Sequence, residues 1–252
     1  MIRAHAVPLL SVLALLAPVA LHAEDSANRE AALFDRPALV KSVPPKSGKD
    51  QSGEIRCTWY RDFMVRETGT DSPAPGAAAI VPRSEAGARA SCTAAPAAGE
   101  VPLKTEDHSL LGKKGPFLVF DAADPYGAVP FIVIDSGSGR VIYTDGKSTD
   151  GLKSVALAGG SLHISYKRAF NGSCPILKDA AGCWSKIAQA GNFPPRLAKS
   201  PPPVDACTAS YAKGNVPADD PSMITYDVDV TIDAAGKSKI NSFGTAGCDP
   251  LP

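Results

Sequence analysis

Six cysteines follow an N-terminal export signal, and this combination constrains the fold more than any other feature of the chain. An even number of cysteines in an exported protein predicts three disulfides. We expect each cysteine to pair with the next one along the chain, because two of them flank a short loop and the other pairs would each tie the ends of a strand unit. The predicted pairs are Cys57 with Cys92, Cys174 with Cys183, and Cys207 with Cys248.

A metal site is the competing interpretation of the cysteines, and the spacing disfavours it. The chain has no C-x-x-C pair, and beyond residue 23 its only histidines are His108 and His163. Structural zinc sites usually combine such pairs with further cysteine or histidine ligands. The sequence therefore predicts disulfides, with no metal and no cofactor, and the lack of C-x-x-C also disfavours a redox enzyme.

Residues 1–23 have the pattern of a secretory signal peptide. Arg3 supplies the positive charge, residues 7–21 are mostly apolar, and Ala23 is a small residue suited to cleavage. The apolar stretch is shorter than the about 20 residues that a spanning helix needs, and Pro18 interrupts its end. We expect cleavage near Ala23, a periplasmic or secreted location, and no membrane span in the mature chain.

The charge of the chain is balanced, with 26 basic and 26 acidic residues. Proteins that bind nucleic acid or anionic membranes usually carry a basic patch or a basic excess. We therefore expect no nucleic-acid partner and no polybasic membrane contact.

Composition divides the chain beyond the signal into four segments. Residues 24–53 are polar and rich in proline and lysine, which predicts a flexible leader. Residues 54–192 contain most of the strand patterns and form the predicted β domain. Residues 193–203 are proline-rich and predict an extended spacer, and residues 204–252 form a C-terminal hairpin segment that we expect to pack on the same domain.

Alternation of apolar and polar residues predicts the strands. The alternation is clear over residues 55–66. It places Trp59 on the core face and Tyr60 on the opposite face, which makes Tyr60 a weak candidate for an interface residue. In the central region the predicted strands are residues 117–120, 130–135 and 140–143, followed by a second hairpin of residues 154–157 and 162–168. The best strand is residues 224–232, which turn at residues 233–236 into a partner strand at 238–243.

These elements predict a mainly β fold with antiparallel sheets built from hairpins, arranged as a sandwich or an open barrel. No strand is followed by the long crossover helix that parallel sheets need. One short helix is expected at residues 180–190, where Trp184, Ile187 and Ala188 have helical spacing before Gly191.

Known catalytic and nucleotide-binding motifs are absent or incomplete in the sequence. No serine lies in a G-x-S-x-G elbow. The two G-K-S stretches, residues 146–148 and 236–238, lack the earlier glycine of a phosphate loop and are interpreted as turns. Residues 145–151 resemble part of a calcium loop, but Lys147 occupies a ligand position and Ala156 replaces the closing glutamate of an EF-hand.

Three side chains are the weak catalytic candidates. Asp227 and Asp229 project from one strand face about 7 Å apart, close enough to share a cation or flank a glycosidic bond. His163 falls on a polar strand face and could act as a general base if the fold supplied a partner. The simpler interpretation is that all three belong to solvated outer faces.

The sequence favours an exported, non-enzymatic protein that binds another envelope protein or a glycan. This hypothesis depends on the disulfide-bonded β scaffold and the lack of a recognisable catalytic motif. The alternative is a periplasmic hydrolase that brings Asp227, Asp229 or His163 together in the fold. It requires at least one of them in a concave pocket with a second polar group in reach.

Overall fold

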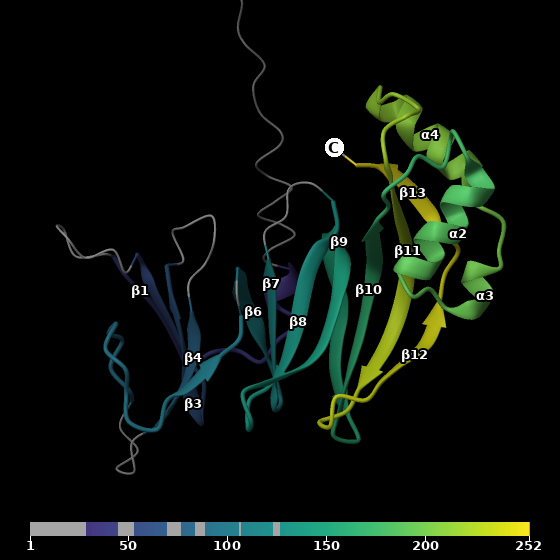
Figure 1. Cartoon of the computed structure of the whole chain (residues 1–252). Helices are drawn as coiled ribbons and strands as arrows, with labels where there is room; N and C mark the ends of the chain where they lie inside the picture. Colours follow the sequence, from purple (N-terminus) through teal and green to yellow (C-terminus); the bar gives the residue numbers. More distant parts are fainter. Residues whose placement is uncertain are drawn as a thin grey trace, which may run out of the picture.

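Two antiparallel sheets of unequal size form the framework of the described chain (Figure 1). The computed structural model describes residues 29–44, 53–69, 77–83, 89–105, 107–122 and 127–251. The small sheet consists of β1 (Leu39–Val43), β2 (Ile55–Trp59), β3 (Phe63–Thr68), β4 (Ala78–Pro82) and β5 (Val101–Leu103), in that order. The large sheet consists of β6 (His108–Lys114), β7 (Phe117–Ala122), β8 (Val129–Asp135), β9 (Arg140–Ala158), β10 (Ser161–Asn171), β11 (Ser222–Ile232), β12 (Ser238–Phe243) and β13 (Gly247–Pro250). The predicted mainly β, antiparallel fold is confirmed.

Strands β6 to β12 lie side by side in the large sheet, and β13 pairs with β11 beyond the end of β12. Neither sheet closes on itself along the described strands, and side chains of the small sheet pack against one face of the large sheet, so the two sheets form a sandwich. The hairpin turns predicted at residues 136–139, at Gly159 and Gly160, and at residues 233–236 all connect neighbouring antiparallel strands.

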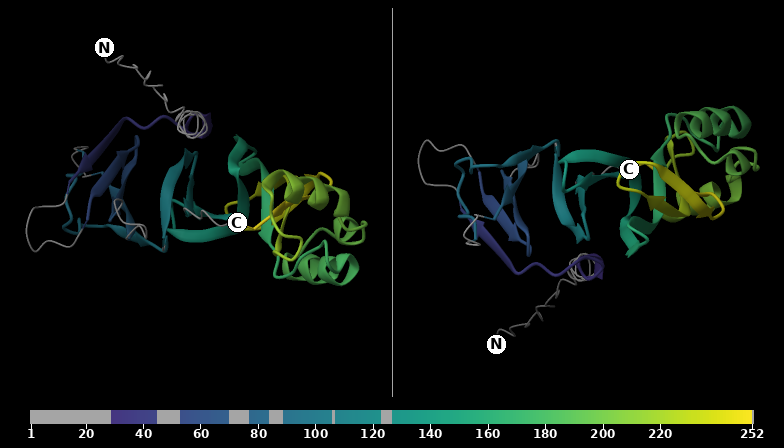
Figure 2. Two further views of the ribbon diagram at one scale, coloured as in Figure 1. Left: turned by 90° about the horizontal axis from the view of Figure 1, so that it is seen from above. Right: turned by 90° about the horizontal axis from the view of Figure 1, so that it is seen from below.

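The centre of the large sheet is buried on both faces. On one face Leu118, Phe120, Ile132 and Ile134 pack against the small sheet, where Val65 and Ile80 contribute to the same apolar cluster. On the other face the alternate residues, among them Phe117, Val119, Phe131 and Val133, join a cluster that continues to the helices. The sandwich core therefore lies between the small sheet and β6 to β8 (Figure 2).

Three helices pack at the opposite end of the large sheet, beside β10 to β13 (Figure 1). Helix α2 (Ala180–Ala190) is the predicted helix, and its N-terminal Gly182 N–H donates to the Asp179 side chain. The structure adds α3 (Pro195–Ala198) within the segment expected to be an extended spacer and α4 (Val204–Gly214) at the start of the C-terminal segment. Proline is tolerated in a first helical turn, where its missing N–H has no intrahelical acceptor.

The prediction of one continuous strand over residues 55–66 is wrong, and so is the predicted position of Tyr60 on an exposed face. Residues 55–66 form two antiparallel strands, β2 and β3, joined by a turn at Arg61 and Asp62. The turn brings Tyr60 into the core between the sheets, where it is 6% exposed and packs near Phe63. The prediction that Tyr60 is an exposed interface residue is therefore wrong, whereas Trp59 is buried as expected.

Two other segments are more regular than expected. Residues 140–158 form the single long strand β9, so the supposed turn at residues 146–148 lies within a strand. Its pairing register with β10 shifts between residues 165 and 168, and Gly151 has a φ of +80°. The expected leader also contains β1, which pairs with β2, and residues 29–35 contact the large sheet.

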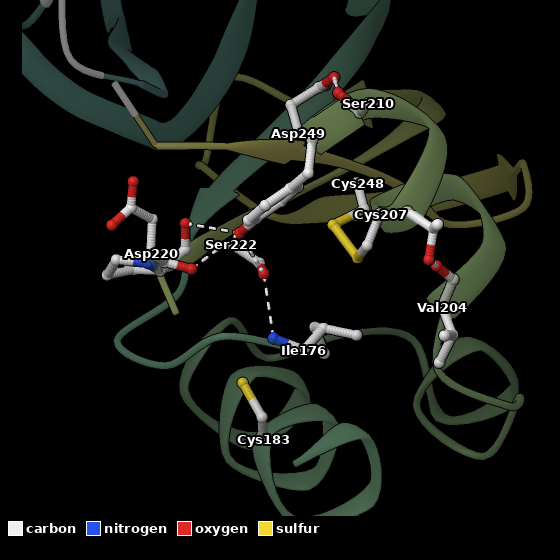
Figure 3. The surroundings of a disulfide bond; sticks show 12 residues. Ile176, Cys183, Val204, Cys207, Ser210, Asp220, Ser222, Cys248 and Asp249 are labelled. Carbon is white, nitrogen blue, oxygen red and sulfur yellow. Dashed lines mark hydrogen bonds between the residues drawn. A yellow bond between two sulfur atoms is a disulfide. The ribbon is translucent and has the colours of Figure 1, made fainter. Parts of the chain in front are cut away.

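The three disulfides join the predicted cysteines. Cys207–Cys248 connects α4 to β13, and nearby Ser222 accepts a hydrogen bond from the Ile176 N–H (Figure 3). Cys57–Cys92 holds the loop of residues 89–100 over the small sheet, where Cys92, Ala90 and Ala97 pack on buried Trp59. Three disulfides suggest an exported protein, because such bonds persist mainly in oxidising compartments.

The expected signal peptide, residues 1–23, lies outside the described residues. Among the residues that the structure does describe, no helix is long and apolar enough to cross a membrane.

We predict that removing the Cys207–Cys248 disulfide destabilises the fold more than removing Cys174–Cys183. The two bonds close separations of 41 and 9 residues. The chain-entropy relation then gives about 4 kcal/mol for the longer loop and about 2.5 kcal/mol for the shorter one. Urea denaturation of the two double-alanine variants measures the difference. Equal losses, or a larger loss for Cys174→Ala with Cys183→Ala, would contradict the prediction.

Candidate functional site

The outer face of β10 and β11 carries a run of polar side chains, among them Ser165 and Lys167 on β10 and Asp227 and Asp229 on β11. Alternation places Ile224, Tyr226, Val228, Val230 and Ile232 on the buried face of β11. Asp227 and Asp229 therefore point outward, and both are exposed. The register sets Asp229 opposite Ser165 and Asp227 opposite Lys167 on β10.

Asp227 and Asp229 line one shallow pocket of about 200 Å³. Three further strands contribute polar side chains to its lining, with Lys153 on β9, Ser165 on β10, and Ser242 at the end of β12. The Lys153 ammonium lies 2.6 Å from an Asp227 carboxylate oxygen. The fold thus brings the two predicted carboxylates together with a cation and two hydroxyl groups.

The Asp229 carboxylate accepts hydrogen bonds from two serines, one on each oxygen. Ser165 Oγ donates to Oδ1, and Ser242 Oγ donates to Oδ2. These bonds favour the charged form, so they lower the pKa of Asp229 below its usual value. Asp229 is consequently an ionised acceptor and a poor proton donor.

His163 lies outside this pocket. It lies two residue pairs beyond Ser165 and Asp229, opposite Thr231, and its Nδ1 is 3.2 Å from Thr231 Oγ1. Thr231 Oγ1 also accepts a hydrogen bond of 2.7 Å from Asn241 Nδ2. The structure therefore unites Asp227 with Asp229 and leaves His163 in a separate contact with hydroxyl and amide groups.

A larger groove of about 720 Å³ adjoins the carboxylate pocket at the end of β12. Its lining comes from α3, the proline-rich stretch after it, and residues 241–246. Ser242, Phe243 and Gly244 line both the groove and the carboxylate pocket. The Gly244 N–H donates to the Asp227 carbonyl oxygen at 2.8 Å, which fixes this shared wall where β12 ends.

The opposite, inner face of the large sheet carries a hydrogen-bonded group of polar residues that the sequence did not reveal. Tyr143 and Tyr166 both donate to Asp145 Oδ2, and the Tyr143 bond is 2.9 Å long. Arg168 Nε donates to Asp145 Oδ1 at 2.7 Å, and its NH1 group donates to the Tyr226 hydroxyl at 2.6 Å. The Asp145 carboxylate thus links β9 to β10, and Arg168 extends the network to Tyr226 on β11.

Burial fixes the protonation of the two tyrosines bound to Asp145. It raises the pKa of Tyr143 and Tyr166 above the usual tyrosine value, and the negative charge of Asp145 raises both further. Both hydroxyls therefore stay protonated and donate to the carboxylate at ordinary pH. The sequence does not reveal this network, because the predicted strand ends at residue 143, whereas Asp145 lies inside β9 and is aligned with Tyr143 on one face.

Within the described part of the chain, no group of three or more His, Cys, Asp or Glu side chains could hold a metal ion. Comparison with protein-family models, with curated proteins and with solved structures gives no match for this chain. Function is therefore inferred from the geometry of the site.

We predict that Asp145→Ala destabilises the fold far more than Asp227→Ala. The Asp145 and Arg168 side chains are only 9% and 16% exposed, whereas Asp227 and Lys153 are 59% and 48% exposed. Loss of one partner from a buried pair costs about 3–5 kcal/mol, and an exposed pair contributes about 1 kcal/mol or less. Urea denaturation compares the two variants. Similar losses of unfolding free energy would show that the Asp145 network is not needed for stability.

Proposed function

We propose that this chain is an exported, non-enzymatic protein that binds a glycan of the cell envelope at the Asp227 and Asp229 pocket. The observation that carries the proposal is the exposed pair of carboxylates, held in fixed positions by hydroxyl and ammonium donors from neighbouring strands. Carboxylates accept several hydrogen bonds each, so they can bind sugar hydroxyls while keeping their protein partners.

The rigidity of the scaffold supports binding through a preformed surface. Each pocket residue is on a strand or directly next to one, and β11 is paired along both of its edges. A preorganised site loses little conformational entropy on binding. A shallow pocket open to solvent suits part of a long polymer such as a glycan chain better than a small molecule that must be enclosed.

The hydrolase alternative has weaker geometric support. A glycosidase with two carboxylates needs one of them protonated as the general acid. Here Asp229 is held in its charged form by Ser165 and Ser242, and Asp227 is paired with Lys153. His163 contacts Thr231 instead of either carboxylate. The pocket satisfies the requirement for a concave site but offers acceptors for binding and no general acid.

We predict that Asp229→Asn weakens glycan binding by at least about tenfold, because hydrogen bonds to charged groups contribute about 1.5–3 kcal/mol. A glycan array with the mature protein identifies the ligand, and calorimetry with the best glycan measures affinity. Asp219→Asn is the matched control, since Asp219 is exposed on a turn outside the pocket. Unchanged affinity of the Asp229→Asn variant, or specific turnover of the glycan, would refute the proposal.

The pH dependence of binding gives a second prediction. Because the pKa of Asp229 is lowered, its charge persists as the pH falls, and it is lost only below the usual aspartate value of about 3.9. Glycan affinity should therefore be constant between about pH 8 and pH 5 and decrease only in stronger acid. Calorimetry across this range checks it. A loss of affinity as the pH rises towards 8 would indicate a required protonated group and favour the hydrolase.

A further inference from the structure

The carboxylate pocket and the groove beside it form one surface at the end of β12, where α3 lies next to this strand (Figure 1). Ser242, Phe243 and Gly244 line both of them. A third hollow of about 300 Å³ shares Asp227 and Gly244 with the pocket. The three hollows therefore meet at Gly244.

Gly244 leaves the junction between the pocket and the groove open. It is exposed, and a Cβ atom at residue 244 would be 3.5 Å from the Cβ atom of Asp227. A longer side chain there would therefore enter the space beside this carboxylate. Gly244 does not have a positive φ, so its backbone conformation does not require glycine. The missing side chain thus provides space and does not serve a strained turn.

The groove has the size of a ligand site, whereas the carboxylate pocket alone is smaller than most. Ligand sites commonly have volumes of about 300–1,000 Å³. The groove encloses about 720 Å³ and the pocket about 200 Å³. A glycan that contacts Asp227 and Asp229 therefore needs further surface, and the groove supplies it next to the pocket.

The groove lining combines apolar side chains with hydroxyl and amide groups. Its larger apolar side chains are Leu197, Pro201, Pro203 and Phe243. Phe243 is half-buried and packs against the core cluster of the large sheet, which fixes the position of its ring. A sugar ring has apolar C–H groups on its faces and hydroxyl groups at its rim, so it matches a lining of this mixed kind.

Among the described residues, Arg196 on α3 is the cation of this surface that has no carboxylate partner. Lys153 in the pocket is paired with Asp227. Lys167 in the third hollow is paired with Asp150. Arg196 is exposed, and the described residues that line the groove with it include no Asp or Glu. A guanidinium group can bind a carboxylate through two parallel hydrogen bonds, so the groove favours an anionic group.

We infer that the groove binds an acidic sugar of the same glycan, whose carboxylate contacts Arg196, while Asp227 and Asp229 bind the hydroxyl groups of a neighbouring neutral sugar. The inference rests on the proposed function, because it takes the carboxylate pocket as one part of the glycan site. Opposite charges fix the orientation of the glycan. Two carboxylates against the single Lys153 ammonium make the pocket unfavourable for an anion, whereas Arg196 makes the groove favourable for one. The ligand is therefore an acidic glycan in which acidic and neutral sugars are adjacent.

Calorimetry of the full mature chain with matched acidic and neutral oligosaccharides tests this inference. The probes are oligosaccharides of alternating hexuronic acid and N-acetylhexosamine, and the same oligosaccharides after reduction of their carboxylates to alcohols. We expect the reduction to weaken binding at least about tenfold. Arg196→Gln should weaken binding of the acidic probe to the same extent and leave the reduced probe unaffected. Lys199→Gln is the matched control, since Lys199 is exposed next to α3 but does not line the groove.

Two further variants separate this inference from the proposed function. Asp229→Asn should weaken binding of both probes, because it acts in the pocket. Gly244→Leu should weaken binding of the acidic probe at least about tenfold, because its side chain would close the junction.

The possible outcomes distinguish the two claims. Equal affinity for both probes, equal effects of Arg196→Gln and Lys199→Gln, or full affinity of Gly244→Leu would overturn the inference. If Asp229→Asn still weakens binding in such a case, the proposed function stands without it. Binding of neither probe, or unchanged affinity of Asp229→Asn for both, would overturn the proposed function and the inference together.

Discussion

Burial of β7 and β8 on both faces is the constraint on which the rest of the structure depends. Residues 117–120 and 131–134 are each buried without interruption, so their alternate side chains supply two separate apolar layers. One layer joins the small sheet, and the other continues beneath β9 to β11 to the helices. Because the central strands supply both layers, the strands at the end of the sheet need to bury only one face. The outer face of β10 and β11 can therefore remain polar and hold Asp227 and Asp229 in fixed positions.

The disulfides add covalent links between elements that also contact the apolar clusters. Cys207–Cys248 joins α4 to β13, and β13 follows the short loop after β12, the strand whose end forms the shared wall of the groove and the carboxylate pocket. Cys57–Cys92 fixes the loop that covers the outer face of the small sheet. Cys57–Cys92 and Cys174–Cys183 each join an irregular segment to a regular element, whereas Cys207–Cys248 joins a helix to a strand that follows the loop beside the proposed binding site.

The sequence allowed prediction of the elements whose pattern is local. The alternation of β11, the glycine-containing hairpin turns, the spacing of α2 and the pairing of successive cysteines all correspond to the structure. Prediction failed for the elements and side-chain pairs that tertiary contacts determine. Helix α4 buries only Cys207 and Tyr211, so its pattern is weak, and β1 is exposed over most of its length. The pairing of Asp227 with Lys153 and the network around Asp145 depend on strand register, which no local pattern reveals.

The central claim is that the chain is exported, that its cysteines pair in sequence order, and that this disulfide-bonded scaffold presents Asp227 and Asp229 on the outer face of the large sheet. Non-reducing peptide mapping by mass spectrometry, on protein recovered from the periplasmic fraction of the producing cell, tests it most directly. We expect a mature N-terminus near Glu24 and the pairs Cys57–Cys92, Cys174–Cys183 and Cys207–Cys248. Free thiols on an uncleaved cytoplasmic chain, or a different pairing of the six cysteines, would contradict the account.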